Sequence, residues 1–207
     1  RRSFYAFVEQ VPATIEMKIT GGLIAHYRDR GNVRIEVFKL GGESETGERE
    51  TLVASDRSVS PDGVARTVSL TVQEQGLHRI DLSDGGDLTS VEWPRGQRIC
   101  YKSSIDQPIK TNGRWSLYFY VPRGTRIIGL YAESGGSIHD PSGKKMLDLE
   151  DRKPGYYSLV VPTGADGKLW KTQRAVASIR LLTVPPYLAR SADELLVPRE
   201  VLERDAR

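Results

Sequence analysis

The feature that most constrains this chain is a short alternation of apolar and polar residues that recurs along almost its whole length. Residues 14–20 (TIEMKIT) and 67–72 (TVSLTV) both place an apolar side chain at every second position. A period of two is typical of a strand with one buried and one solvated face, and no stretch before the C-terminal segment sustains a helical period. The pattern predicts an all-β fold of antiparallel β-sandwiches, of the jelly-roll or immunoglobulin-like kind.

Turn sequences at short intervals agree with this prediction. SPDG at 60–63 and DPSG at 140–143 both carry Pro at the second position and Gly at the fourth, which are the preferences of a type I turn. Further chain reversals are marked by Gly-Gly pairs at 21–22, 41–42, 85–86 and 135–136. We therefore expect many short strands joined by tight turns.

The chain is long enough for two small domains. It has 207 residues, of which 38% are hydrophobic, and this suffices for an ordinary core. Residues 2–22 and 114–136 share the order aromatic-rich strand, Val-Pro, second strand and Gly-Gly, which indicates an internal repeat. We predict two tandem sandwiches with these boundaries: 1–105 for the first, 106–113 for a polar linker, 114–190 for the second and 191–207 for a C-terminal helical tail.

Helix is expected only in that tail. Ser191 and Glu194 have the spacing of a capping box ahead of two leucines. Pro198 must end one helical turn or start another, because proline cannot sit in the interior of a helix without breaking it. The sequence predicts two short helical turns.

Charge and composition narrow the classes of partner. The net charge of +3 is a small difference between 30 basic and 27 acidic residues, so no nucleic-acid partner is expected. No apolar run approaches the roughly 18 residues of a membrane span. Cys100 is the only cysteine, so no internal disulfide forms, and its alternating neighbours place it in a buried strand. The first residues lack both Met and the apolar segment of a signal peptide, and we interpret the chain as a piece of a longer protein or a processed product.

The second half carries a series of motifs: VPRGT at 121–125, DPSGK at 140–144 and PGYY at 154–157. The series resembles small β-sandwich accessory modules of secreted bacterial hydrolases and carbohydrate-active enzymes, similar to bacterial pre-peptidase C-terminal domains. The first half departs from the pattern, with no Val-Pro-x-Gly-Thr and an insertion at 41–50. The resemblance implies a secreted or cell-surface location and a partner that is either a polysaccharide or a neighbouring catalytic domain. It implies no catalytic residues.

Exposed aromatic side chains are the candidate ligand contacts. Tyr118 and Tyr120 lie two residues apart on a predicted strand, so their rings would lie side by side, about 7 Å apart, on the face opposite the core. Such a platform can stack on the C–H face of a sugar, with Trp170 or Tyr156 as an additional contact. The alternative is that another part of the protein covers the two rings, and that Trp170 closes the end of the core.

Acidic residues raise the question of a metal. Asp81, Asp84 and Asp87 recur at intervals of three through a glycine-rich turn, and calcium takes several carboxylate and carbonyl oxygens from a flexible loop. The spacing differs from that of an EF-hand loop, so a solvated hairpin is the default interpretation. No other cofactor is expected.

Catalytic signatures are lacking in the sequence. The three histidines are far apart, and the run SIHD at 137–140 does not form a triad, because alternation along a strand separates Asp140 from Ser137 and His139. We therefore expect a non-catalytic accessory region of a larger secreted bacterial enzyme, which binds or positions polysaccharide. One alternative is a structural module that packs on a neighbouring domain or subunit. Another is a catalytic domain with an unrecognised polysaccharide-cleaving site.

Overall fold

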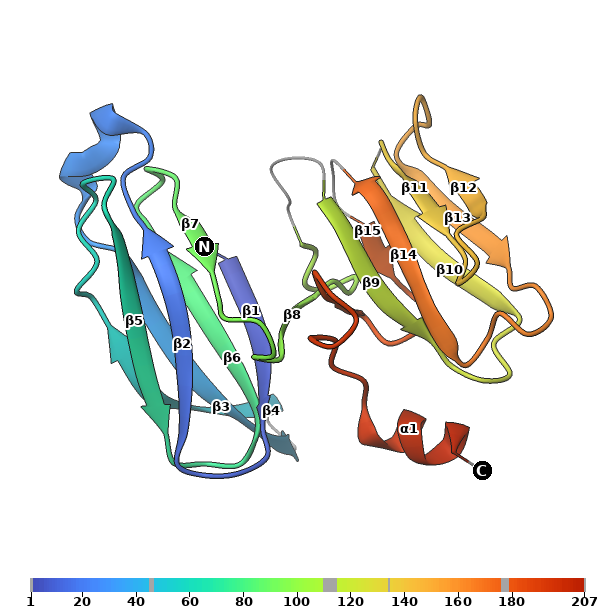
Figure 1. Ribbon diagram of the computed structural model, residues 1–207, viewed down its shortest axis with the longest axis horizontal. Coiled ribbons are helices and arrows are strands. Elements are labelled where there is room, and N and C mark those ends of the chain that lie inside the picture. The colour runs from blue at the N-terminus through green and yellow to red at the C-terminus, as the bar shows by residue number, and fades with distance from the viewer. Residues whose placement is uncertain (1, 45–46, 110–114, 134, 176–178, 207) are drawn as a thin grey trace. The chain divides into compact units, whose positions relative to one another are not determined.

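The computed structural model describes residues 2–44, 47–109, 115–133, 135–175 and 179–206. The chain divides into two compact units, Arg1–Ile99 (unit 1) and Cys100–Arg207 (unit 2). Each unit contains two antiparallel sheets, so the predicted all-β fold is confirmed (Figure 1). The division into two sandwiches at residues 106–113 stays a prediction, and residues 110–113 lie outside the described ranges.

Unit 1 places four strands in one sheet and three in the other. The first sheet has the order β1 (Arg2–Val8), β6 (Gly76–Ser83), β3 (Arg34–Ser44), β4 (Gly47–Asp56). The second has the order β5 (Ala65–Val72), β2 (Ala13–Thr20), β7 (Ser90–Glu92). Met17 on β2 pairs with Val68 on β5, and both side chains are buried, as the alternation predicts. A short 3-10 helix, η1 (Ala25–Arg30), follows β2.

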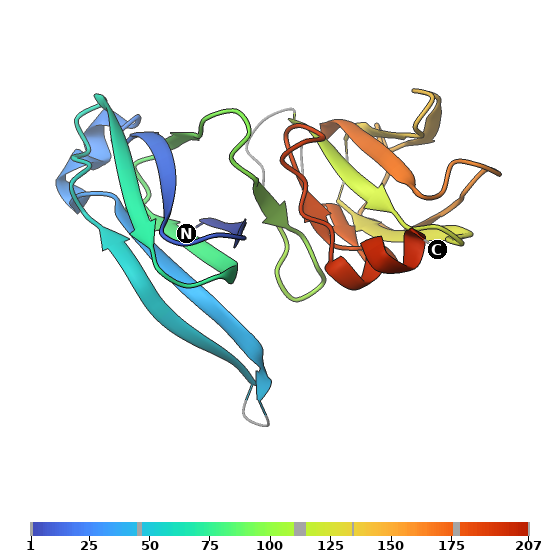
Figure 2. The same ribbon diagram turned by 60° about the horizontal axis from the view of Figure 1, so that its bottom comes forward.

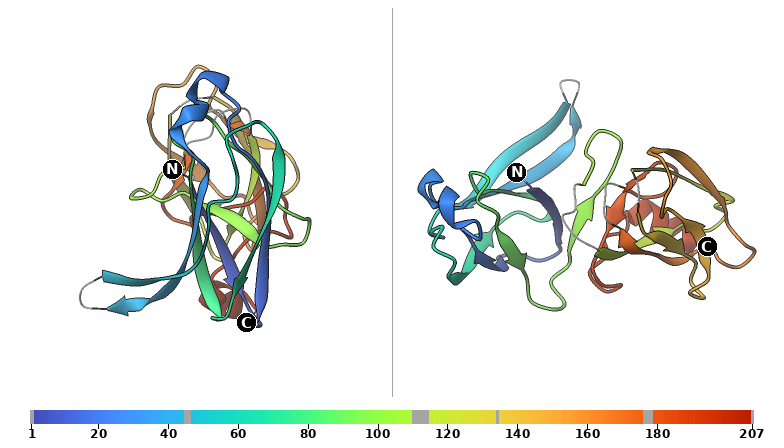
Figure 3. Two further views of the ribbon diagram at one scale, coloured as in Figure 1. Left: turned by 90° about the vertical axis from the view of Figure 1, so that its left-hand side faces the viewer. Right: turned by 90° about the horizontal axis from the view of Figure 1, so that it is seen from above.

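Among the described strands, β3 and β4 form the longest hairpin. Figure 2 shows that its two strands continue as a ribbon beyond the other strands of unit 1, and the left view of Figure 3 shows the ribbon bending away from the sheet. The pairing of β3 with β4 shifts register between Val37 and Phe38 and again between Leu40 and Glu43. Such bulges bend a strand pair and increase its twist.

Unit 2 has a larger and a smaller sheet around its own core. The larger has the order β12 (Lys145–Asp148), β11 (Ser137–His139), β14 (Lys168–Ala175), β9 (Trp115–Val121). The smaller has the order β13 (Gly155–Val160), β10 (Ile127–Ala132), β15 (Ile179–Leu181). Phe119 and Trp170 from the larger sheet and Ile128 and Leu130 from the smaller one belong to a single buried cluster. The turn predicted at 140–143 joins β11 to β12, and Gly143 N donates to Asp140 O at 2.9 Å.

The segment from β1 to β2 and the segment from β9 to β10 follow the same plan, which agrees with the repeat seen in the sequence. In unit 1 the chain passes from β1 to β2 through Val11-Pro12, and in unit 2 it passes from β9 to β10 through Val121-Pro122. In both cases the two successive strands lie in different sheets. The repeated strand, Val-Pro, strand order therefore marks the same crossing from one layer to the next.

The C-terminal segment differs from the prediction. After β16 (Tyr187–Leu188), which pairs with β8 (Ile99–Lys102), residues 191–194 form a bend and a turn, and the prediction of a helical turn there is wrong. The carboxylate of Glu194 is buried and lies 3.7 Å from Arg190 Nε, so it pairs with that group in place of capping a helix. The one helix of the tail, α1 (Arg199–Asp205), begins directly after Pro198. Among the described residues, no helix is long and apolar enough to cross a membrane.

Candidate functional site

The outer face of the smaller sheet in unit 2 carries an exposed aromatic side chain. Along β10, Ile128 and Leu130 are fully buried, so the residues between them point to the other side of the sheet. On the neighbouring strand β13, Leu159 is buried, whereas Tyr156 and Val160 are 70% and 73% exposed. The period of two thus leaves side chains of three adjacent strands on a single exposed surface.

Two tyrosine rings and a guanidinium group meet on this surface. Tyr131 and Tyr156 are opposite each other on β10 and β13, and their ring centroids lie 5.3 Å apart with the ring planes inclined at 71°. On the other side of β10, Arg180 is opposite Tyr131, and its guanidinium carbon lies 4.8 Å from the centroid of that ring. Tyr131, Tyr156 and Arg180, named the tyrosine face below, present an aromatic surface beside a positive charge held by a cation–π contact.

One donor of Arg180 is closed to solvent and, within the described chain, unsatisfied. Its Nε atom is buried, and it has no hydrogen-bond partner among the residues that the structure describes. Ser158, two residues further along β13, is exposed and lies opposite Gly129. The tyrosine face therefore combines ring area with the exposed Ser158 hydroxyl and the partly exposed side chain of Arg180, which are able to bind a ligand that carries hydroxyl or carboxylate groups.

Gly129 leaves room on this surface for the side chain of Thr183. A Cβ atom added to Gly129 would lie 3.0 Å from the Thr183 methyl carbon. Thr183 is held there because its hydroxyl accepts a hydrogen bond from Gly129 N at 2.8 Å and donates to Ile127 O at 3.1 Å. The absence of a side chain at residue 129 therefore allows the chain after β15 to close onto β10.

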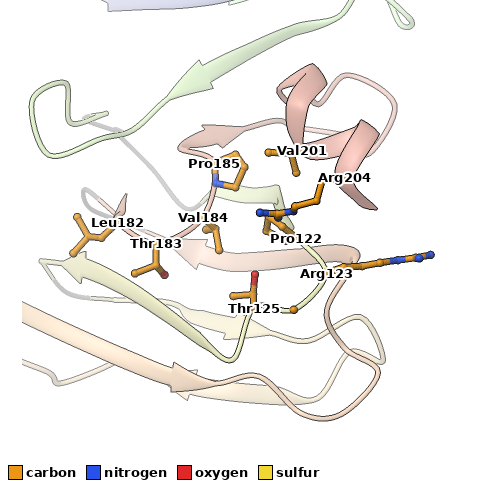
Figure 4. A pocket seen from close by; sticks show the side chains of 10 residues that line it. Pro122, Arg123, Thr125, Leu182, Thr183, Val184, Pro185, Val201 and Arg204 are labelled. Atoms are coloured by element: carbon orange, nitrogen blue, oxygen red, sulfur yellow. The ribbon is translucent and has the colours of Figure 1, made fainter. Parts of the chain in front are cut away.

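An open hollow of about 410 Å³ adjoins the surface at Leu182 and Thr183 (Figure 4). Its lining comes from the turn after β9, from the chain after β15 and from α1. Arg123 and Arg204 contribute positive charge, and in the described part of the chain no carboxylate lines the hollow. Figure 4 shows the Arg204 side chain directed over Pro122, whereas that of Arg123 extends outward. The hollow thus lies toward the Ile127 end of the same sheet, away from the tyrosine pair, and has a basic rim.

The predicted Tyr118 and Tyr120 pair does not form an open platform. Both rings point away from the core, as predicted, but both are half-buried. The hydroxyl of Tyr120 donates to Asp205 Oδ2 on α1 at 2.8 Å, and Lys171 Nζ lies 5.3 Å from the Tyr118 ring centroid. Tyr118 also exchanges two backbone hydrogen bonds with Ala189. The alternative interpretation, that the C-terminal segment covers these rings, fits Tyr120.

The other two predicted contacts differ from each other. Trp170 is 0% exposed, and its indole Nε1 donates to Ala165 O at 2.8 Å. It belongs to the core and cannot touch a ligand, so its assignment as a binding residue is corrected. Tyr156 is the predicted contact that the structure leaves open. Its partners Tyr131 and Arg180 were missed, because only the pairing of β10 with β13 and β15 brings them together.

The three predicted metal ligands are also separated. Asp81 is buried on β6, where it accepts hydrogen bonds from Ser3 Oγ at 2.6 Å and Arg79 Nε at 3.1 Å. Asp81 therefore serves an ion pair and does not belong with Asp84 and Asp87, which lie in the following loop. Among the described residues, no group of three or more His, Cys, Asp or Glu side chains comes together where a metal ion could be held.

The run at 137–140 contains a Ser–His pair without an acid. Ser137 Oγ lies 2.9 Å from His139 Nε2, and His139 Nδ1 lies 3.0 Å from Gly143 O. The carboxylate of Asp140 accepts from the Ser142 and Lys144 amides of its own turn, so it does not orient the imidazole. Asp140 acts as a turn residue, which agrees with the expectation from strand alternation.

Comparison with known proteins provides no relative from which a function could be transferred, because no family model, no curated protein and no solved structure matches this chain. A function must therefore be inferred from the exposed side chains of unit 2.

Proposed function

We propose that this chain is a non-catalytic accessory region of a larger secreted bacterial enzyme and that it binds polysaccharide at the tyrosine face. The observation that carries the proposal is the exposed ring of Tyr156, 70% accessible and held 5.3 Å from the Tyr131 ring. A ring fixed by a neighbouring ring loses little conformational entropy when a ligand stacks on it. Sugar rings offer C–H faces edged by hydroxyls, which match an aromatic surface flanked by Arg180 and Ser158.

The charges around this surface favour an acidic polysaccharide. Arg180 lies within the tyrosine face, and Arg123 and Arg204 line the adjoining hollow. A guanidinium group binds a carboxylate through two parallel hydrogen bonds, which gives more energy and more directional specificity than contact with a neutral hydroxyl. We therefore infer that uronic-acid polymers bind more tightly than neutral ones and that salt weakens their binding.

The test compares the full chain with two single variants. Binding to cellulose, xylan, pectate and alginate is measured for the wild type, Tyr156→Ala and Tyr118→Ala. We expect Tyr156→Ala to bind about tenfold more weakly or worse, because the stacking surface is lost, and Tyr118→Ala to bind like the wild type. Equal binding by the wild type and Tyr156→Ala would show that polysaccharide does not bind at the tyrosine face.

A second candidate function is supported by apolar side chains on the same surface. Ile127, Val160 and Leu182 are 53%, 73% and 39% exposed, and they lie around the end of the sheet opposite the tyrosine pair. Clustered exposed apolar side chains often mark a contact with another protein domain. In this alternative, unit 2 is a structural module that packs on a neighbouring domain.

One further variant separates the two candidates. Val160→Lys places a charge among the apolar side chains and leaves the tyrosine face intact. Polysaccharide binding that survives Val160→Lys and is lost in Tyr156→Ala supports the first function. A wild type that binds no polysaccharide and self-associates, together with a monomeric Val160→Lys variant, supports the packing function.

A further inference from the structure

A buried carboxylate without a partner lies in unit 1, in a part of the molecule that the proposed function does not use. Asp87 is 0% exposed, and neither of its carboxylate oxygens has a hydrogen-bond partner among the described residues. Two residues further on, Thr89 is 2% exposed, and its hydroxyl oxygen is also buried without a hydrogen-bond partner among the described residues. Buried polar atoms in folded proteins are nearly always satisfied, so three such oxygens within three residues call for an explanation.

The surrounding loops hold Asp87 in place without using its carboxylate. Its backbone N donates to Asp84 O at 3.3 Å, and its backbone O accepts from Ile24 N at 2.8 Å. The neighbouring Leu88 O accepts from Leu23 N at 3.1 Å. The loop after β6 is thereby fixed to the chain that leads into η1. These backbone hydrogen bonds fix the loop in the conformation that buries the Asp87 carboxylate.

The cationic side chains of these loops have other partners. Arg30 Nη1 donates to Gly85 O at 2.9 Å, and its guanidinium carbon lies 3.8 Å from the centroid of the Tyr27 ring. Arg28 Nε donates to Gly22 O at 2.8 Å. Neither guanidinium group makes a hydrogen bond to Asp87, so its negative charge is offset only in part, by the charge of Arg30 and by the backbone amides of Gly22 and Asp87.

A buried carboxylate is unfavourable in its charged form. Burial raises the pKa of Asp87, and the nearby charge of Asp84 raises it further; the charge of Arg30 and the neighbouring backbone amides lower it, but the pKa stays above its ordinary value. A buried acid in this position is stabilised either by a proton or by a bound cation. The two possibilities differ in the role that they give to Thr89 Oγ1 and to the carboxylate of Asp84, whose Oδ1 accepts a hydrogen bond from Gly86 N at 3.1 Å. A cation would take these as further oxygen ligands, whereas a proton on Asp87 would not.

We propose that the loop of residues 84–89 binds a calcium ion through the carboxylate of Asp87, with the carboxylate of Asp84 and the hydroxyl of Thr89 as further oxygen ligands. All three donors are oxygens, and a set of carboxylate and neutral oxygens from one flexible loop suits calcium better than zinc or copper, which prefer nitrogen and sulfur. The site excludes Asp81, whose carboxylate is used by Arg79 and Ser3. It is independent of the tyrosine face.

The experiment titrates calcium chloride into the chelator-treated full chain and follows both calorimetric binding and thermal unfolding. We expect one calcium ion per chain and a rise in Tm that saturates with the ion. Asp87→Asn keeps the shape of the side chain and removes its charge, so we expect it to lose both effects and to be at least as stable as the wild type in chelator. Thr89→Val, which removes one oxygen, should weaken binding without abolishing it.

The matched control is Asp62→Asn in the same unit. Asp62 is an accessible aspartate that pairs with Arg66 at 2.5 Å, far in sequence from the loop, and its loss should leave calcium binding unchanged. A wild type that neither binds calcium nor gains stability from it would overturn the proposal and leave a protonated Asp87 as the explanation. Retention of binding by Asp87→Asn, or binding of magnesium in preference to calcium, would overturn it as well.

Discussion

At the scale of single residues, Asp205 joins the C-terminal helix to the end of β9. Its Oδ2 accepts hydrogen bonds from the Tyr120 hydroxyl and from Arg123 N, each at 2.8 Å. Burial on its own raises the pKa of Asp205, but these hydrogen bonds outweigh burial and the pKa lies below the ordinary value. Burial and the bond to Asp205 raise the pKa of Tyr120 to about 12, so its hydroxyl remains a donor at neutral pH.

We predict that Asp205→Ala lowers the free energy of unfolding by about 1–3 kcal/mol at pH 7, the usual loss when hydrogen bonds to a charged group are removed. Urea denaturation measures the change. The control is Glu203→Ala on the same helix, whose carboxylate forms only an exposed pair with Arg199 and whose loss should cost about 0.5 kcal/mol or less. An equal effect of both variants would show that Asp205 does not anchor the helix.

Comparing the wild type with Asp205→Ala at several pH values also gives the pH dependence of this contribution to stability. Because the pKa of Asp205 is lower in the folded state than in the unfolded chain, its contribution is fully present above the unfolded value of about 3.9. It is lost as the pH falls through the folded value. The difference in stability between wild type and Asp205→Ala should therefore stay constant from neutral pH down to about pH 5 and shrink below about pH 4. A difference that grows on acidification would contradict this account.

At the scale of elements, the smaller sheet of unit 2 depends on the close approach of Thr183 to Gly129. A methyl group at residue 129 would lie 3.0 Å from the Thr183 methyl carbon, and two hydrogen bonds prevent Thr183 from moving away. The sheet surface that carries Tyr131 and Tyr156 is thus built around one residue without a side chain.

We predict that Gly129→Ala destabilises the protein by about 1–3 kcal/mol, the range for an inserted group in a filled space. Thermal unfolding measures the loss. Gly155→Ala on the adjacent strand is the matched control, since an added Cβ there meets only Lys153 O at 4.0 Å. If Gly129→Ala were as stable as Gly155→Ala, the contact with Thr183 would not be a constraint.

Elements with a clear period could be read from the sequence. The alternation in residues 14–20 and 67–72 predicted β2 and β5 and their buried faces, because side-chain direction follows directly from strand geometry. The capping-box prediction failed at Glu194, because its buried carboxylate pairs with Arg190, four residues earlier, in place of capping a helix. Local signals thus held where burial and period agreed, and failed where another local pairing competed.

At the scale of the whole molecule, the alternation of apolar and polar residues predicted the all-β architecture, but it did not predict the candidate site. Tyr156 was selected from sequence, but its neighbours Tyr131 and Arg180 depend on which strands pair, and strand pairing joins residues far apart in the chain. For the same reason, the sequence could not decide whether Trp170 contacts a ligand or belongs to the core, and only its burial showed that it belongs to the core. The regular spacing of Asp84 and Asp87 could be read from the sequence, but the lack of hydrogen-bond partners for the buried oxygens of Asp87 and Thr89 could not.

The central claim is that the tyrosine face binds polysaccharide, and the most direct test is to map binding on the full chain by NMR. Oligogalacturonate is titrated into the isotope-labelled protein while the backbone amides and the Arg180 Nε–H signal are followed. The account predicts shifts at Tyr131, Tyr156 and Arg180, and none at Tyr118 or Tyr120 on the other sheet. Shifts confined to Tyr118 and Tyr120, or no saturable shifts with either oligogalacturonate or a neutral cello-oligosaccharide, would contradict it.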